Sequence, residues 1–405
     1  MKKTLLTVWL MGFVAVAQAQ LYDPSAFDKK YDGLLKHPGV QIESAEAINQ
    51  MYNYKFYDAD KEFRWLQLRY PKHPMPYFLM GLSEWWKIVP NTDVTDYDDK
   101  CLAYMDTTIN LAEKLYDNSD NKLEPAFFLA AAYAFKGRLY SERKKWTKAT
   151  FAGKNALKYF DKCKGNADFS PELLFGDGMY NYYAQWIPEN YPLLKPILMF
   201  FPKGNKVNGI KELEKTANSA FYTRVEARYF LVQIYSMENQ YDKAYQMSKY
   251  MNEQYPDNPF FERYYARSAF VIGHLPEAER ISKDILEKVG RTQSGYEGVS
   301  GRTAAYILAY INHLFYKNIP EAKKYYQQSI DFAKQTNSTN AGYYWSSVLG
   351  LAKIATEEKN YDLAQTYFKE VMDKAERKSN QYKEAKKALD DAKKSRREER
   401  RKRRD

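Results

Sequence analysis

The chain has 405 residues, 28% of them charged, and a formal net charge of +11. That charge is uneven, because residues 383–405 alone carry twelve Lys or Arg against six Asp or Glu. The four histidines are scattered, and no two stand at the spacing of metal ligands, so the sequence predicts no metal site. Apart from residues 383–405 the chain is close to neutral, so most of its net positive charge lies at the C-terminal end.

Residues 1–19 have the pattern of a cleaved signal peptide. Two lysines precede the apolar run Thr4–Ala17, and small residues precede a cleavage point before Gln20. The alternative is a membrane anchor, but the run is shorter than the roughly 20 apolar residues of a spanning helix. No cysteine at the cleavage point offers a lipid attachment site. We expect an exported protein, in the periplasm or on the periplasmic face of the outer membrane of a Gram-negative bacterium. Export argues against nucleic acid as a partner.

The first part of the mature chain has helical patterns throughout. Strongly helical runs span Leu102–Tyr116, Pro125–Tyr140 and Trp146–Phe160. Cys101 falls near the start of one such run, and Cys163 falls at the end of the equivalent helix one repeat later. Equivalent helices run parallel, so these positions lie on the order of 20 Å apart. A disulfide needs Cα atoms within about 7 Å, so we expect two separate thiols.

A proline-rich apolar insertion at residues 188–206 interrupts the next helix pair. Ser170–Ile187 and Val207–Ala220 have the patterns of a first and a second helix, and a short turn is expected between them. Two interpretations stay open. The insertion either folds onto the helices as a short apolar helix, or forms an exposed patch that meets a membrane, an acyl chain or a partner helix. The large side chains concerned are Leu193, Leu194, Ile197, Leu198, Phe200 and Phe201.

The second half of the chain repeats one helical pattern. A small residue recurs on alternate helices, at Ala244, Ala278, Ala322 and Ala364, with a bulky residue after it. Alanine lets two helices approach closely, and this arrangement is typical of tetratricopeptide repeats. We predict an all-α fold, an α-solenoid of about six or seven helix pairs over residues 20–380, with a longer loop at 291–301.

Residues 381–405 form a basic, partly helical C-terminal tail in this interpretation. The tail is either a solvated end or a contact for an anionic surface such as phospholipid or lipopolysaccharide phosphates. The residues that would make this contact are Arg396, Arg397, Arg400, Arg401, Lys402, Arg403 and Arg404.

The stretch FGDGMYNYYAQWIP…LLKPILMFFPKGNKVNGIKEL resembles the central signature of the tetratricopeptide-repeat-thirty-nine family of eukaryotes. That family includes the yeast inclusion-body-clearance protein of the mitochondrial outer membrane. A Gly-x-Gly helix, here with Gly176 and Gly178, leads through an apolar stretch to a helix with Gly209. The resemblance implies a helical repeat scaffold working near a membrane, with no catalytic residues. The export signal and the usage of Lys, Tyr and Asn are similar to those of exported repeat proteins of the Bacteroidetes group.

No motif in the sequence points to catalysis or to a cofactor. Gly176 and Gly178 lie in a helix pattern with no strand before them, so they predict close helix packing rather than a phosphate loop. We therefore expect a non-enzymatic scaffold that binds a protein or peptide on a concave face rich in Tyr and Trp, with peripheral membrane contact through the insertion and the tail. The alternative is a carrier or sensor of an apolar or lipid ligand, with the insertion as lid or pocket wall.

Overall fold

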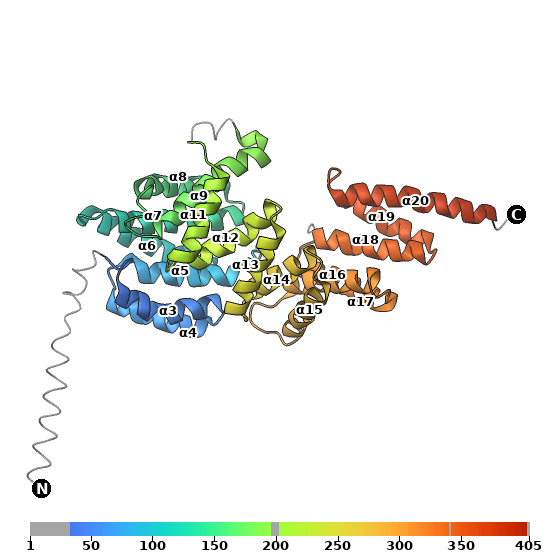
Figure 1. Ribbon diagram of the computed structural model, residues 1–405, viewed down its shortest axis with the longest axis horizontal. Helices are drawn as coiled ribbons and strands as arrows, with labels where there is room; N and C mark the ends of the chain where they lie inside the picture. The colour runs from blue at the N-terminus through green and yellow to red at the C-terminus, as the bar shows by residue number, and fades with distance from the viewer. Residues whose placement is uncertain (1–32, 196–201, 340–341, 403–405) are drawn as a thin grey trace, which may run out of the picture. The chain divides into compact units, whose positions relative to one another are not determined.

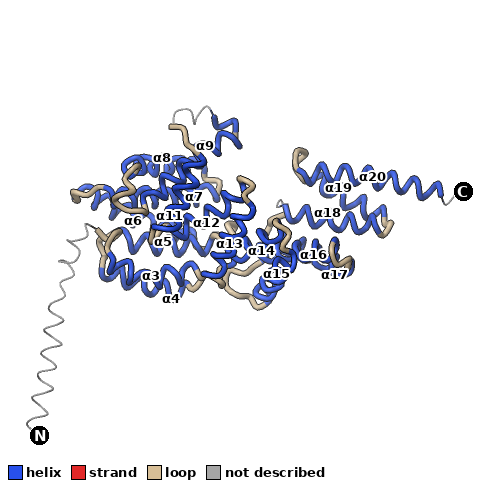
Figure 2. Tube along the Cα trace, in the orientation of Figure 1, coloured by secondary structure: helices blue, strands red, loops and turns tan. Residues whose placement is uncertain are grey.

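A computed structural model describes residues 33–195, 202–339 and 342–402 of the chain (Figure 1). Over these residues it contains 17 α-helices and one short 3-10 helix, and no strand (Figure 2). Neighbouring helices pack in series along the chain. The predicted all-α class of serially packed helices is confirmed. The predicted signal peptide, residues 1–19, lies outside the described residues.

The chain divides into two compact units, which we describe separately. Among the described residues, unit 1 consists of 33–48, 59–81, 102–195 and 202–223, and unit 2 of 49–58, 82–101, 224–339 and 342–402. The divisions fall inside four helices: α3 (Pro38–Tyr52), α4 (Phe56–Arg69), α5 (Pro74–Ile88) and α6 (Asp98–Asn118).

Unit 1 contains two further helix pairs. Helix α7 packs on α8, and α9 packs on α11. Their bounds, with the 3-10 helix η1 that follows α9, are α7 (Leu123–Glu142), α8 (Trp146–Cys163), α9 (Leu173–Asn190), η1 (Pro192–Leu194) and α11 (Lys206–Ser219). The three runs predicted near residues 102, 125 and 146 and the helix predicted near residue 207 are confirmed.

Helix α9 continues past the point where the sequence predicted its end. The expected stop was Ile187, yet Pro188 lies inside the helix, which ends at Asn190. Contacts with the start of α11 hold this last turn: the backbone N–H of Lys206 donates to Gln185 Oε1 at 2.8 Å, and Lys206 Nζ lies 2.9 Å from Glu189 Oε2. These contacts offset the backbone hydrogen bond that proline cannot make.

Two glycines bring α9 and α11 together. A Cβ atom on Gly209 would lie 2.5 Å from the backbone nitrogen of Tyr182 and 2.7 Å from the carbonyl oxygen of Gly178. A Cβ on Gly178 would lie 2.8 Å from Leu213 Cγ. No side chain fits at these distances, so the prediction that Gly178 permits close helix packing is confirmed.

Unit 2 contains nine helices that lie wholly within it among the described residues. Each packs on its neighbour in sequence, and α14, α16, α18 and α20 also contact one another in order. Their bounds are α12 (Arg224–Met237), α13 (Tyr241–Gln254), α14 (Pro259–Val271), α15 (Leu275–Gly290), α16 (Gly298–Leu314), α17 (Ile319–Gln335), α18 (Gly342–Glu357), α19 (Tyr361–Lys374) and α20 (Asn380–Lys402). The predicted alanines of α13, α15, α17 and α19 are all buried.

One turn conformation recurs before the second helix of a pair. The residue two positions before the helix start has a left-handed backbone, with φ between 54° and 83°, at Tyr54, Lys144, Asn239, Gly273, Lys317 and Lys359. A left-handed residue ends the first helix and lets the next begin within two residues. The shared geometry shows that these helix pairs are copies of one structural unit.

Helix α20 differs from the predicted tail. Ala385, Leu389 and Ala392 are buried in the same core cluster as Phe368 of α19. Their spacing of four and three residues places them on one helix face. The first half of the expected tail is therefore a packed final helix, and a solvated end is wrong for it.

Candidate functional site

A cavity of about 810 Å³ opens between α7, α8 and α9 of unit 1. Its volume is typical of a pocket for a small organic ligand, for which the usual range is about 300–1,000 Å³. The described lining residues are Phe127, Ala130, Ala131, Ala134, Phe135, Ala156, Leu157, Phe160, Cys163, Glu172, Leu173, Phe175, Gly176, Met179, Tyr180, Tyr183, Ala184, Ile187, Pro188, Lys195, Pro202 and Lys203. Most of this wall is apolar.

Small residues create the space. Helix α7 presents Ala130, Ala131 and Ala134 to the cavity, where longer side chains would fill it. On the opposite side, the Phe160 ring packs against Gly176, where an added Cβ would come within 2.9 Å of the ring. The Phe160 ring also stacks on Tyr180, with ring centroids 5.4 Å apart. Aromatic rings therefore form part of the cavity wall, and alanine and glycine residues leave the space open.

The acidic group in the wall is already bound. Glu172 is buried, and its carboxylate accepts hydrogen bonds from the backbone N–H groups of Phe221 (2.6 Å), Tyr222 (3.0 Å) and Thr223 (2.8 Å). The Thr223 hydroxyl adds a fourth bond at 2.6 Å. Four donors satisfy this carboxylate, so its role is to hold the turn at 221–223 rather than to act on a ligand.

The insertion supplies the basic part of the wall. Lys195, Pro202 and Lys203 line the cavity, and the Tyr180 hydroxyl donates a 2.7 Å hydrogen bond to the carbonyl of Pro202. This bond ties the end of the insertion to α9. Within the described ranges, Lys203 has no ion-pair partner within 4 Å. The pocket therefore combines an apolar interior with two lysines at the insertion.

The predicted apolar contact residues fall mostly beyond the described part of the chain. Leu193 is 93% exposed, so burial of this side chain on the helices is wrong. Ile197, Leu198, Phe200 and Phe201 lie outside the described residues, as does the side chain of Leu194. The described ends of the insertion, at Lys195, Pro202 and Lys203, line the cavity.

The predicted basic contact residues are only partly described. Arg396 forms an ion pair with Asp362, at 2.7 Å between its Nη1 and the carboxylate Oδ1. Arg397 and Arg401 are exposed. The remaining predicted contacts lie outside the described part of the chain: Arg403 and Arg404 entirely, and Arg400 and Lys402 for their side chains. Arg397 and Arg401 are thus the described members of this set that meet solvent.

Both cysteines are free, as predicted, and the structure shows that both are buried. Burial raises the pKa of the Cys101 thiol to about 12, and burial likewise raises the pKa of the Cys163 thiol to about 12. A thiol with such a pKa stays protonated at neutral pH and is a poor nucleophile. Cys163 therefore contributes a small apolar surface to the pocket.

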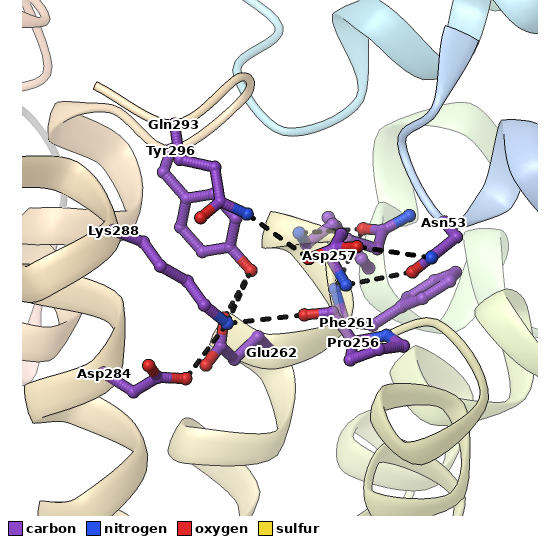
Figure 3. Close-up of polar contacts among 11 residues, drawn as sticks. Asn53, Pro256, Asp257, Phe261, Glu262, Asp284, Lys288, Gln293 and Tyr296 are labelled. Carbon is purple, nitrogen blue, oxygen red and sulfur yellow. Dashed lines mark hydrogen bonds and ion pairs between the residues drawn. The ribbon is translucent and has the colours of Figure 1, made fainter. Parts of the chain in front are cut away.

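Unit 2 contains a buried cluster of charged groups (Figure 3). Lys288 Nζ lies 2.9 Å from Glu262 Oε2 and 3.0 Å from Asp284 Oδ2, and the Tyr296 hydroxyl donates to Glu262. Burial raises the pKa of Glu262 to about 7. Glu262 is 2% exposed, so its carboxylate does not meet a substrate in this structure.

In the same region of unit 2, hydrogen bonds of Asp257 hold neighbouring loops together. Its backbone N–H donates to Asn53 Oδ1 at 3.0 Å, and Gln293 Nε2 donates to its carboxylate at 3.4 Å (Figure 3). These bonds connect the turn after α3, the turn before α14 and the loop before α16. The cluster therefore holds these three segments in place, which is a structural role.

The described ranges contain neither a metal-ligand cluster nor a membrane-spanning helix. No group of three or more His, Cys, Asp or Glu side chains is placed to hold a metal ion within 33–195, 202–339 and 342–402. In the same ranges, every helix is too short or too polar to cross a bilayer.

The sequence did not reveal the α7 and α8 sides of the pocket. The run PAFFLAAAYAF is apolar around the whole of α7, which indicates burial without saying against what. The cluster of alanines at 130, 131 and 134 was the available signal, because three small residues on one helix mark a close approach or a cavity.

Comparison with known proteins gives a distant structural likeness. No protein-family model and no curated protein matches the sequence. The solved structures that match include the crystal structure of yeast Tom70, at 16% sequence identity and a TM-score of 0.36. The match covers 79% of this chain and 64% of the Tom70 chain, so it spans less than two thirds of that protein.

Proposed function

We propose that this protein is a non-catalytic helical-repeat scaffold whose unit 1 pocket holds an apolar ligand. The observation that supports this most is the cavity of about 810 Å³, walled by Phe, Ala, Met and Tyr side chains and by the described ends of the insertion. Helix pairs that pack mainly on their neighbours provide a rigid frame for such a pocket.

The groups that could do chemistry near the pocket are occupied or inert. Four donors hold the Glu172 carboxylate, and burial keeps the Cys163 thiol protonated. Binding without catalysis is therefore the activity that the residues support. Burial of an apolar chain would contribute about 25 cal/mol for each Å² removed from water.

A fluorescent apolar dye tests this function. N-phenyl-1-naphthylamine should brighten on binding the wild-type protein. Ala134→Trp places a ring in the pocket and should abolish the signal, while Ser141→Trp, at an exposed position of the same helix outside the pocket, should leave it unchanged. Equal dye binding by both variants would show that the dye binds elsewhere and would refute the pocket as the site.

A protein or peptide partner is the second candidate. Trp65 and Leu68 of unit 1 are exposed and lie on one face of α4. Exposed aromatic residues are enriched at the energetic centres of protein interfaces. A photo-crosslinker at Trp65 should capture a partner in cells, and the same crosslinker at exposed Lys61, one turn earlier on the same face, should capture it too. Loss of capture in a Leu68→Ala variant would support this face, and unchanged capture would contradict it.

Export to the periplasm and contact with an anionic membrane complete the proposal. The packed half of α20 makes deletion of the tail a poor test, because deletion would also remove Leu389 from the core. Arg397→Glu/Arg401→Glu reverses two exposed charges and leaves that core intact. The variant should bind anionic liposomes less well than wild type at low salt. Unchanged binding would assign the exposed part of α20 to solvent.

A further inference from the structure

We infer that the ligand of the unit 1 pocket is a single-chain amphiphile with an anionic carboxylate or phosphate head group. Its chain would lie in the apolar interior and its head group at Lys195 and Lys203. The inference rests on the proposed function and names the class of ligand.

The charges around the opening favour an anion. Of the described lining residues, only Glu172, Lys195 and Lys203 are Asp, Glu, Lys, Arg or His, and the carboxylate of Glu172 is held by its four donors. Lys164 Nζ lies 5.1 Å from the centre of the Tyr180 ring, but its charge already acts on the carboxyl groups of Asp177 and Glu212. The wall therefore offers positive charge without an available negative one.

Two nearby acids oppose this charge only in part. Glu189 is near Lys195, but it already pairs with Lys206 at 2.9 Å, and hydrogen bonds from Lys206 and Gln185 hold its pKa below the usual range. Asp161 is an exposed neighbour of Tyr180 and is not among the residues that line the pocket. Lys203 keeps no ion-pair partner among the described residues. An anionic head group would supply the missing partner.

The rest of the wall selects against other ligands. A cationic head group would meet the two lysines and be repelled. A neutral chain would gain only the burial of its apolar surface. An acidic peptide would satisfy the lysines but would bring backbone N–H and C=O groups into a wall that has few partners for them, and unpaired polar groups are costly to bury.

Three matched dodecyl amphiphiles test the inference by displacing N-phenyl-1-naphthylamine. Dodecanoate should bind wild type about 5-fold more tightly than dodecanol at low salt, as expected for two partly exposed ion pairs. Dodecyltrimethylammonium should bind more weakly than dodecanol. The preference for dodecanoate should shrink as salt is raised.

Charge reversal identifies the residues. Lys195→Glu/Lys203→Glu should remove the preference for dodecanoate and leave dodecanol binding within about 2-fold of wild type. Lys154→Glu/Lys158→Glu changes two exposed lysines of α8 that do not line the pocket, and should keep the preference. Circular dichroism checks that each variant is folded. If the first variant fails to fold, the salt dependence in wild type still decides the question.

The outcomes separate the two claims. Equal affinity of wild type for dodecanoate and dodecanol at low salt would overturn the anionic head group and leave the apolar pocket standing. Failure of all three amphiphiles to displace the dye would overturn the proposed function itself. Displacement by an acidic amphipathic peptide but by none of the amphiphiles would assign the pocket to a protein partner.

Discussion

Substitution of Gly209 by alanine tests how unit 1 is held together. A Cβ at this position would lie 2.5 Å from the backbone nitrogen of Tyr182 and 2.7 Å from the carbonyl oxygen of Gly178. Both atoms belong to α9 backbone, so no side-chain rotation can relieve the overlap. Helices α9 and α11 would have to separate by about 0.9 Å to restore an ordinary contact of 3.4 Å.

The expected cost follows from that separation. Forcing an extra methyl group into a packed core typically costs about 1–3 kcal/mol. Alanine in a helix interior recovers up to about 1 kcal/mol relative to glycine. We therefore expect Gly209→Ala to destabilise the α9–α11 pair by about 1–2 kcal/mol. Gly153 of α8 is the matched control, because no atom lies within 4 Å of its added Cβ, and Gly153→Ala should stabilise α8 by about 0.5–1 kcal/mol.

Native-state hydrogen exchange measures both effects in their own helices. In Gly209→Ala, the amides of α9 and α11 should exchange about 5- to 30-fold faster than in wild type, since about 1.4 kcal/mol corresponds to a tenfold change. Amides of α14 in unit 2 serve as the internal reference and should not change. Unchanged or slower exchange in α9 and α11 would show that the glycine contact does not limit the approach of these helices.

Three further predictions concern buried groups. Glu172→Ala leaves the amides at 221–223 without their acceptor and should lower the free energy of unfolding by roughly 3 kcal/mol in urea; a loss under about 0.5 kcal/mol would contradict the assigned role. Burial raises the pKa of Glu262 from 4.5 to about 7, so its contribution to stability should be full below pH 4.5 and lost as pH rises through 7. Glu262→Gln should flatten this part of the pH profile of stability, and an unchanged profile would assign the pH dependence to other groups. Cys101 and Cys163 should react with a disulfide reagent at neutral pH only after unfolding, so rapid reaction of the folded protein would contradict their burial.

The repeat architecture was accessible from the sequence because its causes are local. An alanine at the crossing of two helices and a bulky residue three or four positions later follow from helix geometry alone. The buried alanines of α13, α15, α17 and α19 confirm this reasoning. Tyr326 shows the contact with the next pair, since a Cβ on Gly350 of α18 would lie 2.3 Å from its ring.

The predictions for the end of α9 and for the C-terminal segment were wrong because contacts with another helix decide the structure there. Proline predicts the end of α9 at Ile187, but contacts from Lys206, which follows in α11, hold one more turn. The charge of the C-terminal segment predicts a solvated tail, but Ala385 and Leu389 pack in a core cluster with residues of α19. Local composition contains neither contact, so neither could be inferred from it.

The pocket could be inferred only in outline. The insertion was recognised as a candidate wall because it is apolar, broken by prolines and placed inside a helix pair. The alanines of α7 and the stacking of Phe160 on Tyr180 bring residues twenty or more positions apart into one cavity wall. That arrangement depends on the packing of three helices, which no single segment specifies.

The most direct test of the central claim is a crystal structure of the protein soaked with bromododecanoate, with bromine located by its anomalous scattering. Our account predicts a bromine peak inside the cavity between α7, α8 and α9, with the carboxylate near Lys195 and Lys203. Bromine found only on the outer surface, with the cavity free of ligand, would contradict it.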